Sequence, residues 1–198
     1  MEDSRKKECN TETLNKQQFS PVKLLSPKST QGKNLTGSVR HIRDLSADIH
    51  AIIQQWNVAH LQGLSILKRI TQEKQDESYS QVLQELCDKL EAVCNELDDN
   101  VKQLYQITQQ IRIMASIEKS TNKLFTTWPT TKFGDVAEMI YTAYSREAEI
   151  KRKVLEDVAH HQTDSWSMLF LATWVHQPFL PENLTTLLES LLVETGHR

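Results

Sequence analysis

The chain has 198 residues, of which 38% are hydrophobic and 25% charged, and its formal net charge is -3. This balance argues against binding nucleic acid through bulk positive charge, and only five glycines and five prolines argue against a turn-rich β fold. No apolar run is long enough to span a membrane, and the opening MEDSRKKECN lacks the apolar core of a signal peptide.

Residues 1–37 are predicted to be a disordered tail, because they are polar, interrupted by prolines and glycines, and without helical period. Two proline-directed sequences lie within it, SPVK starting at Ser20 and SPKS starting at Ser26. Cyclin-dependent kinases favour the lysine that stands three residues after Ser20. We therefore expect Ser20 and Ser26 to be phosphorylated, Ser20 more readily, which would add negative charge to the tail. The alternative is a chance match of Ser-Pro in a disordered segment.

Residues 38–120 are predicted to form two long helices, because apolar residues recur there in steps of three and four, the a/d pattern of a coiled coil. The polar TQEKQDESYS between them can hold a turn, so we predict an antiparallel coiled-coil hairpin with helices about 50 Å long. We call the two apolar stripes the seams. The seams contain Ile42, Leu45, Ile49, Ile52, Trp56, Ala59, Gly63, Ile66 and Ile70, then Leu83, Leu86, Leu90, Val93, Leu97, Asn100, Leu104, Ile107, Ile111 and Met114.

Apolar residues beside the seams predict further contacts, because a two-helix hairpin covers only one stripe of each helix. We expect a third and a fourth helix, from this chain or from another, and a homo- or heterodimer formed through the hairpin. An intramolecular core is the simpler alternative for the seams themselves. The residues beside the seams are Ile53, Leu61, Leu64, Leu67, Val82, Val101 and Tyr105.

Leu90, Leu97 and Asn100 are the hairpin residues that we predict to bind a partner. Counting outward from the connection places Leu97 near Trp56, and Leu90 near the small Gly63. Asn100 is polar within an apolar seam, and a buried polar residue at such a position controls register or partner choice in coiled coils. The equally weighted alternative is that Asn100 lies at a solvated edge.

The segment TTWPTTKF, residues 126–133, interrupts the helical pattern. Pro129 cannot continue a preceding helix, and Thr130 or Thr131 can cap the following one. Trp128 and Phe133 would then pack this joint against the core. The functional alternative is a partner-binding corner in which Trp128 is exposed.

Residues 121–198 are predicted to form a smaller C-terminal helical region, which makes the whole fold all-α. After a third helix, SWSMLFLATWVHQPF predicts a helix capped by Ser165 and ended by Pro178, buried because it is apolar on most sides. A last helix begins near Glu182, and Gly196 fits its C-terminal cap. Phe179, beside the rigid turn, is a predicted partner-binding anchor, with core packing as the alternative.

No enzyme motif is present: the sequence has no phosphate-binding glycine loop, no HExxH and no recognisable nucleophile setting. His160, His161 and His176 are the candidate metal cluster, but adjacent histidines on a helix point about 100° apart. The three cysteines lack CxxC spacing and predict a reduced intracellular compartment. We expect no catalytic residue, no cofactor and no metal site.

FTTWPTTKF, EIKRKVLEDVAH, LATWVHQPF and SLLVETGHR, in this order and spacing, closely resemble the cyclin-dependent kinase 2-interacting protein family. RHIRDLSADIHAIIQQWN resembles the first helix of that family. The resemblance covers about residues 38–198 and is strongest after Phe125, whereas the tail departs most.

This resemblance implies a non-enzymatic adaptor in the nucleus, with no direct contact to nucleic acid. The implied partners are cyclin-dependent and Cdc7-type kinases at replication origins, and the checkpoint protein that partners the ATR kinase in DNA damage signalling and repair. AAA ATPases and a further helical subunit are also implied, in a complex for replisome protein turnover and ribosome maturation. The alternative from a different class is a purely structural coiled-coil tether that self-associates.

Overall fold

The computed structural model describes residues 37–73, 81–117, 125–161 and 163–198. The all-α prediction is confirmed. The predicted tail, apart from Gly37, lies outside the described residues together with Ser20 and Ser26, and so does the predicted boundary between residues 120 and 121. The helices are α1 (Ser38–Glu73), α2 (Gln81–Ile117), α3 (Thr130–Val158), α4 (Asp164–His176) and α5 (Asn183–Glu194).

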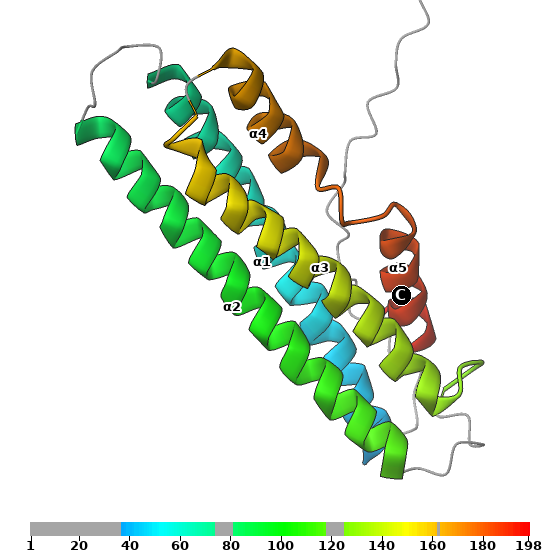
Figure 1. Cartoon of the computed structure of the whole chain (residues 1–198). Helices are drawn as coiled ribbons and strands as arrows, with labels where there is room; N and C mark the ends of the chain where they lie inside the picture. Colours follow the sequence, from blue (N-terminus) through cyan, green and yellow to red (C-terminus); the bar gives the residue numbers. More distant parts are fainter. Residues whose placement is uncertain (1–36, 74–80, 118–124, 162) are drawn as a thin grey trace, which may run out of the picture.

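The predicted antiparallel hairpin is formed by α1 and α2, which lie side by side and run in opposite directions (Figure 1). Every residue of the two seams is buried except Ile66 and Met114, which are partly buried. The spacing of apolar residues therefore determined both helices and the faces that they bury.

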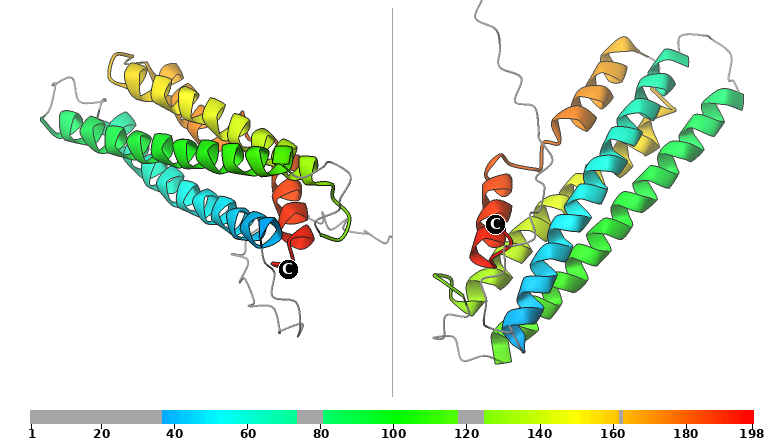
Figure 2. Two further views of the ribbon diagram at one scale, coloured as in Figure 1. Left: turned by 90° about the horizontal axis from the view of Figure 1, so that it is seen from below. Right: turned by 180° about the vertical axis from the view of Figure 1, so that it is seen from behind.

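The C-terminal helices turn this hairpin into a bundle. α3 lies along α2, while α4 and α5 follow one another along the side formed by α1 and α3 (Figures 1 and 2). The result is a four-helix bundle whose fourth helix is broken between His176 and Asn183. One hydrophobic core contains residues from all five helices, so the third and fourth helices that the sequence calls for come from this chain. No helix in the described ranges is both long and apolar enough to cross a membrane.

The prediction that α4 is buried holds for the side that faces the bundle and is wrong for the opposite side. Phe170 and Trp174 are buried, but Trp166, Met168 and Leu169 are exposed. Of the described helices, α1 and α3 make the main contacts with this helix, and a sequence that is apolar around the whole helix gives no indication of which side they cover.

The segment TTWPTTKF is a joint that Glu194, at the end of α5, holds in place. The Glu194 carboxylate accepts the backbone N–H of Trp128 at 2.8 Å and the hydroxyl of Thr127 at 2.7 Å, and it also accepts the N–H of Thr127. Burial alone would raise the pKa of Glu194, but these donors together outweigh it and hold the pKa below its usual value. The last turn of α5 is thereby connected to the start of α3.

The rings of the joint pack as predicted. The rings of Phe125 and Trp128 lie 5.4 and 5.3 Å from the ring of Phe133, between centroids, and Trp128 is partly buried. The predicted threonine cap is wrong, because Pro129 occupies the cap position of α3 and Thr130 is the first helical residue. The fixed φ of proline suits this place, where an N–H would have no helical partner.

The predicted ends of the last two helices are right except at one cap. α4 begins at Asp164 with Thr163 as its cap residue, not Ser165, and it ends at His176 before Pro178. At the end of α5, Gly196 has φ +73° and its N–H donates to the Val193 carbonyl. The next N–H, that of His197, donates to the Leu192 carbonyl at 2.9 Å, which completes a Schellman motif.

Glu194→Ala should lower the free energy of unfolding by about 1.5–3 kcal/mol, because it removes the charged acceptor of the joint and leaves backbone N–H groups unpaired. Urea unfolding followed by circular dichroism measures this change. Glu189→Ala is the matched control on the same helix, since Glu189 forms an exposed ion pair with Arg198 and should change stability by less than about 1 kcal/mol. Equal losses in the two variants would contradict the role of Glu194.

Candidate functional site

The break in the fourth helix is surrounded by three buried polar side chains, Glu147, Lys151 and His60. Gln177, at φ 45°, turns the chain out of α4, and Pro178 prevents continuation of the helix. A helix end leaves backbone carbonyl and N–H groups without helical partners, and burying such groups unpaired costs about 1–3 kcal/mol each. Two side chains from α3 supply partners for backbone groups here.

Glu147 and Lys151 form a buried ion pair on α3 that satisfies the backbone on both sides of the break. Their side chains are 0% and 1% exposed, and Lys151 Nζ lies 3.1 Å from Glu147 Oε1. Lys151 Nζ also donates to the Trp174 carbonyl at 3.2 Å, near the end of α4. Glu147 Oε2 accepts the backbone N–H of Phe179, just after the break, at 3.1 Å.

His60 on α1 completes the surroundings of the lysine. Its Nδ1 lies 3.2 Å from Lys151 Nζ, and the ammonium lies 4.4 Å from the centroid of the Trp174 ring. Burial, and then the charge of Lys151, lower the pKa of His60 to about 4, so its ring is neutral and accepts a hydrogen bond from the ammonium. Burial likewise lowers the pKa of Lys151 and raises that of Glu147, and their mutual attraction opposes both shifts.

Two tryptophans fix the break from α1 and α4. Trp56 Nε1 donates to Gln177 Oε1 at 3.0 Å, and the Trp56 ring stands edge-on to Tyr144, with centroids 4.9 Å apart. Trp174 Nε1 donates to the His60 carbonyl at 3.0 Å.

Gly63 makes room for this arrangement. A Cβ atom at Gly63 would lie 2.2 Å from Trp174 Cζ2, so only glycine fits beneath the ring. The space that a side chain of residue 63 would occupy is filled by Trp174 of α4, whereas the expected proximity of Gly63 to Leu90 stays a prediction. The sequence could not show that Trp174 fills this space, since it does not indicate which helix covers that side of α1.

The cluster of Glu147, Lys151, His60 and Trp174 is closed to solvent. We therefore interpret it as a structural element that fixes the break, and not as a site that could act on a substrate. Among the described residues, no three His, Cys, Asp or Glu side chains lie close enough to hold a metal ion together. His161 instead stacks on Trp166, with centroids 4.3 Å apart.

A surface groove lies beside this buried cluster, between α3 and the chain that connects α4 to α5. Phe179 is 41% exposed and Met139, on α3, is 49% exposed. The groove has a volume of about 330 Å³, with an apolar lining and two charged residues, Glu138 and Arg146. We call it the Phe179 groove. Its other lining residues are Thr142, Ala143, Pro181, Asn183 and Leu184.

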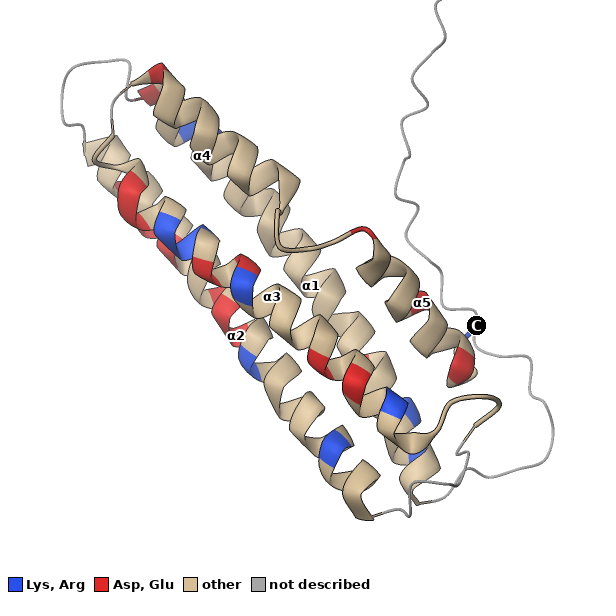
Figure 3. Ribbon diagram, turned by 45° about the vertical axis from the view of Figure 1, so that its right-hand side comes forward, with Lys and Arg blue, Asp and Glu red and all other residues tan. Residues whose placement is uncertain are grey.

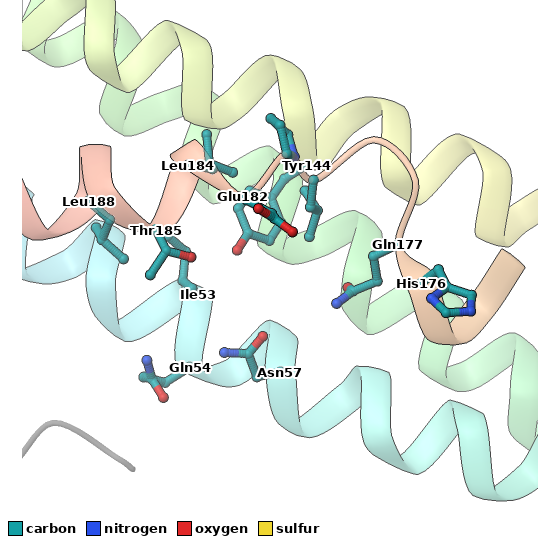
Figure 4. A pocket seen from close by; sticks show the side chains of 12 residues that line it. Ile53, Gln54, Asn57, Tyr144, His176, Gln177, Glu182, Leu184, Thr185 and Leu188 are labelled. Atoms are coloured by element: carbon teal, nitrogen blue, oxygen red, sulfur yellow. The ribbon is translucent and has the colours of Figure 1, made fainter. Parts of the chain in front are cut away.

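A smaller pocket of about 220 Å³ opens on the α1 side of the same break (Figure 4). Figure 4 shows Gln54 and Asn57 of α1 on one side of it and Glu182 and Thr185 on the other, with Gln177 at one end, toward His176. The break thus leaves a hollow on each side of the α4–α5 connection, and the one toward α1 is more polar.

The predicted partner-binding residues fall in three different places. Leu90, Leu97 and Asn100 are buried inside the bundle, so a partner could reach them only if the bundle opened, and their binding role stays a prediction. Asn100 does not lie at a solvated edge, and its Nδ2 has no hydrogen-bond partner among the described residues. Trp128 belongs to the joint, and Phe179 is in the groove, where it is accessible to a partner.

Sequence reasoning missed Glu147, Lys151 and His60. Tyr144, Glu147, Lys151 and Val154 continue from Ile140 in steps of four and three, so two charged residues occupy positions of the buried stripe. That conflict between charge and periodicity is the signal that could have identified the pair.

Proteins named cyclin-dependent kinase 2-interacting protein match most of this chain. The Xenopus laevis protein is 30% identical over 190 residues, which cover 83% of this chain and 92% of the relative. The Bos taurus protein is 29% identical and the Homo sapiens protein 28% identical, each over 208 residues that cover 89% of this chain and 98% of the relative. No model of a protein family matches the chain.

Lys151→Met should destabilise the protein by about 3–5 kcal/mol, because it leaves Glu147 buried without its counter-charge. Adding Glu147→Leu to this variant should recover part of the loss, since the isolated buried charge is then removed. Urea unfolding of both single variants and the double variant gives the coupling energy. Additive losses would show that the two side chains do not act as a pair.

His60→Asn should make stability less sensitive to acid, because asparagine keeps an acceptor near the position of Nδ1 but does not titrate. The pKa of His60 is about 4 in the folded chain, against 6.5 for an unperturbed histidine. The unfolded state therefore binds more protons between these values, and stability is lost as pH falls through this window.

Between pH 7 and 5 the wild-type chain should lose about 1–2 kcal/mol more than His60→Asn. The raised pKa of Glu147 acts in the opposite direction but is present in both proteins, so the comparison isolates His60. Urea unfolding at the two pH values measures the difference, and equal losses would contradict the assignment.

Proposed function

The chain belongs to the cyclin-dependent kinase 2-interacting protein family, and we propose that it is a non-catalytic cell-cycle adaptor whose Phe179 groove binds a protein kinase. The name of its relatives supports the class of partner. The exposed side chain of Phe179, beside the rigid break, supports the location of the binding site in this groove.

The Phe179 groove has the properties of an anchoring site for a protein. The backbone at Phe179 is held by the hydrogen bond from its N–H to buried Glu147, so binding would cost little ordering of the chain. Exposed aromatic residues in apolar pockets carry much of the energy of protein interfaces. Glu138 and Arg146 at the edge of the groove offer both signs of charge to the rim of a partner.

The wider role that we propose rests on the resemblance of the sequence to this family. In this role the protein acts in the nucleus and connects two kinds of signalling to DNA replication. One comes from cyclin-dependent and Cdc7-type kinases, and the other is checkpoint signalling through the ATR kinase and its partner. It is also a subunit of an AAA ATPase complex for replisome protein turnover and ribosome maturation. Phosphorylation of Ser20 and Ser26 would then regulate the adaptor from its N-terminal segment.

Phe179→Ala should weaken binding to cyclin-dependent kinase 2 with its cyclin at least tenfold, a loss of about 1.4 kcal/mol or more, while the fold stays intact. Surface plasmon resonance with purified proteins measures binding, and thermal melts measure stability. Tyr105→Ala is the matched control, because Tyr105 is 47% exposed on α2, away from the groove.

Trp174→Ala is the structural comparison for this test, because Trp174 is fully buried and its loss should cost about 3–5 kcal/mol. If Phe179→Ala lowers the melting temperature as much as Trp174→Ala does, Phe179 is a core residue and the groove is not the site. If Phe179→Ala and Tyr105→Ala bind the kinase equally well, the proposal is also wrong.

A further inference from the structure

One side of α4 presents an apolar face that no other element in the described part of the chain covers. Phe170 and Trp174 point into the bundle and are 5% and 0% exposed. On the opposite side, Met168, Leu169 and Val175 are 71%, 51% and 43% exposed, and the small Ala172 is exposed between them. Figures 1 and 2 show α4 on the outside of the bundle. Such a concentration of exposed apolar side chains on one short helix is typical of an interface.

The two ends of this face carry an acidic and a basic residue, respectively. Asp164 is the first residue of α4 and His176 is the last, and the helix has no other Asp, Glu, Lys, Arg or His. Figure 3 marks Asp and Glu in red, and Lys and Arg in blue. Asp164, Met168, Ala172 and His176 follow one another at intervals of four, so they lie along one side of the helix. All four are exposed. The face therefore runs from an acidic end, over a large and a small apolar residue, to a basic end.

We propose that this face binds α4 of a second copy of the chain, in antiparallel orientation. A two-fold axis at the level of Phe170 would place Asp164 opposite His176 of the second copy, and Met168 opposite Ala172 of the second copy. Both contacts occur twice in such an isologous pair. Each large side chain meets a small one, each acid meets a base, and the two helix dipoles are antiparallel.

The pattern favours a second copy over other occupants. A second α4 that runs in the opposite direction presents these groups in reverse order. It therefore places a complementary residue opposite each of the four positions of the face. A membrane surface would require Lys or Arg at the edge of the apolar face, and α4 has neither. The predicted dimer through the hairpin would need Leu90 and Leu97, which are buried inside the bundle. This inference goes beyond the proposed adaptor function, because α4 and the Phe179 groove are different surfaces.

The small size of the face predicts weak association. A helix of 13 residues is about 20 Å long, and one pair of such helices buries less than the roughly 1,200 Å² typical of stable interfaces. We expect a dissociation constant on the order of tens of micromolar.

Sedimentation velocity of the full chain between about 5 and 500 µM tests the proposal, with a dimer at the upper end as the expected result. Met168→Asp should weaken dimerisation at least tenfold, because it introduces charge at the centre of the face. Ile113→Asp is the matched control, because Ile113 is 58% exposed on α2, and it should dimerise like the wild type. A monomeric wild type at all concentrations, or equal effects of the two substitutions, would overturn the proposal.

Charge exchange tests the orientation. Asp164→Lys and His176→Glu should each weaken the dimer, and the double variant should restore it, because the pairs then form with reversed signs. Circular dichroism of each variant controls for loss of α4 itself. Failure of the double variant to recover, with helicity intact, would overturn the antiparallel pairing.

Cysteine cross-linking tests the register in a background with Cys9→Ser and Cys87→Ser. A mixture of Met168→Cys and Ala172→Cys chains carrying different tags should form mainly mixed disulfides, whereas equal self-linking would overturn the register. Deletion of residues 1–36 tests the remaining occupant. If dimers form only after this deletion, the N-terminal segment covers the face in the full chain and the second-copy proposal is overturned.

Discussion

The break in the fourth helix is the constraint on which the rest of the structure depends. Breaking a helix inside a bundle exposes backbone groups to an apolar interior, where unpaired groups are costly. One ion pair on α3 meets this requirement, because Lys151 donates to the last turn of α4 and Glu147 accepts the first free N–H after the break. The desolvation of the two charges opposes folding, so the pair is better explained by the specific geometry that it enforces than by net stability.

Fixing the break has consequences at both ends of the bundle. The chain after it leads into α5, whose Glu194 holds the joint before α3, so the last helix is connected to the beginning of the third. The chain before it is α4, which packs mainly against α1 and α3 among the described helices. A continuous fourth helix would have left neither the hollows beside the α4–α5 connection nor Phe179 at the surface. The features that support binding therefore follow from a local interruption of an otherwise regular fold.

The sequence predicts the helices well and the break poorly, for a physical reason. The seams of α1 and α2 are long and strictly periodic, so the helices and their buried faces follow from spacing alone. α4 is apolar on all sides, so periodicity cannot say which side faces solvent. Glu147 and Lys151 occupy buried positions, and their partners are backbone groups from a segment more than twenty residues away. These hydrogen bonds are tertiary contacts, so the spacing of residues within one helix cannot predict them.

The same distinction separates core from interface in this chain. A long heptad pattern is usually the first place to look for a partner, yet here α3 and the broken fourth helix meet that need within one chain. Leu90 and Leu97 thus stabilise the bundle, and the two binding surfaces that we propose are short features without periodicity: one aromatic residue after a turn and the outer side of a 13-residue helix. These surfaces are small because the periodic apolar residues are buried in the core. Small surfaces suit exchangeable contacts, as the proposed adaptor function would require, since weak interfaces can form and dissociate without unfolding the protein that carries them.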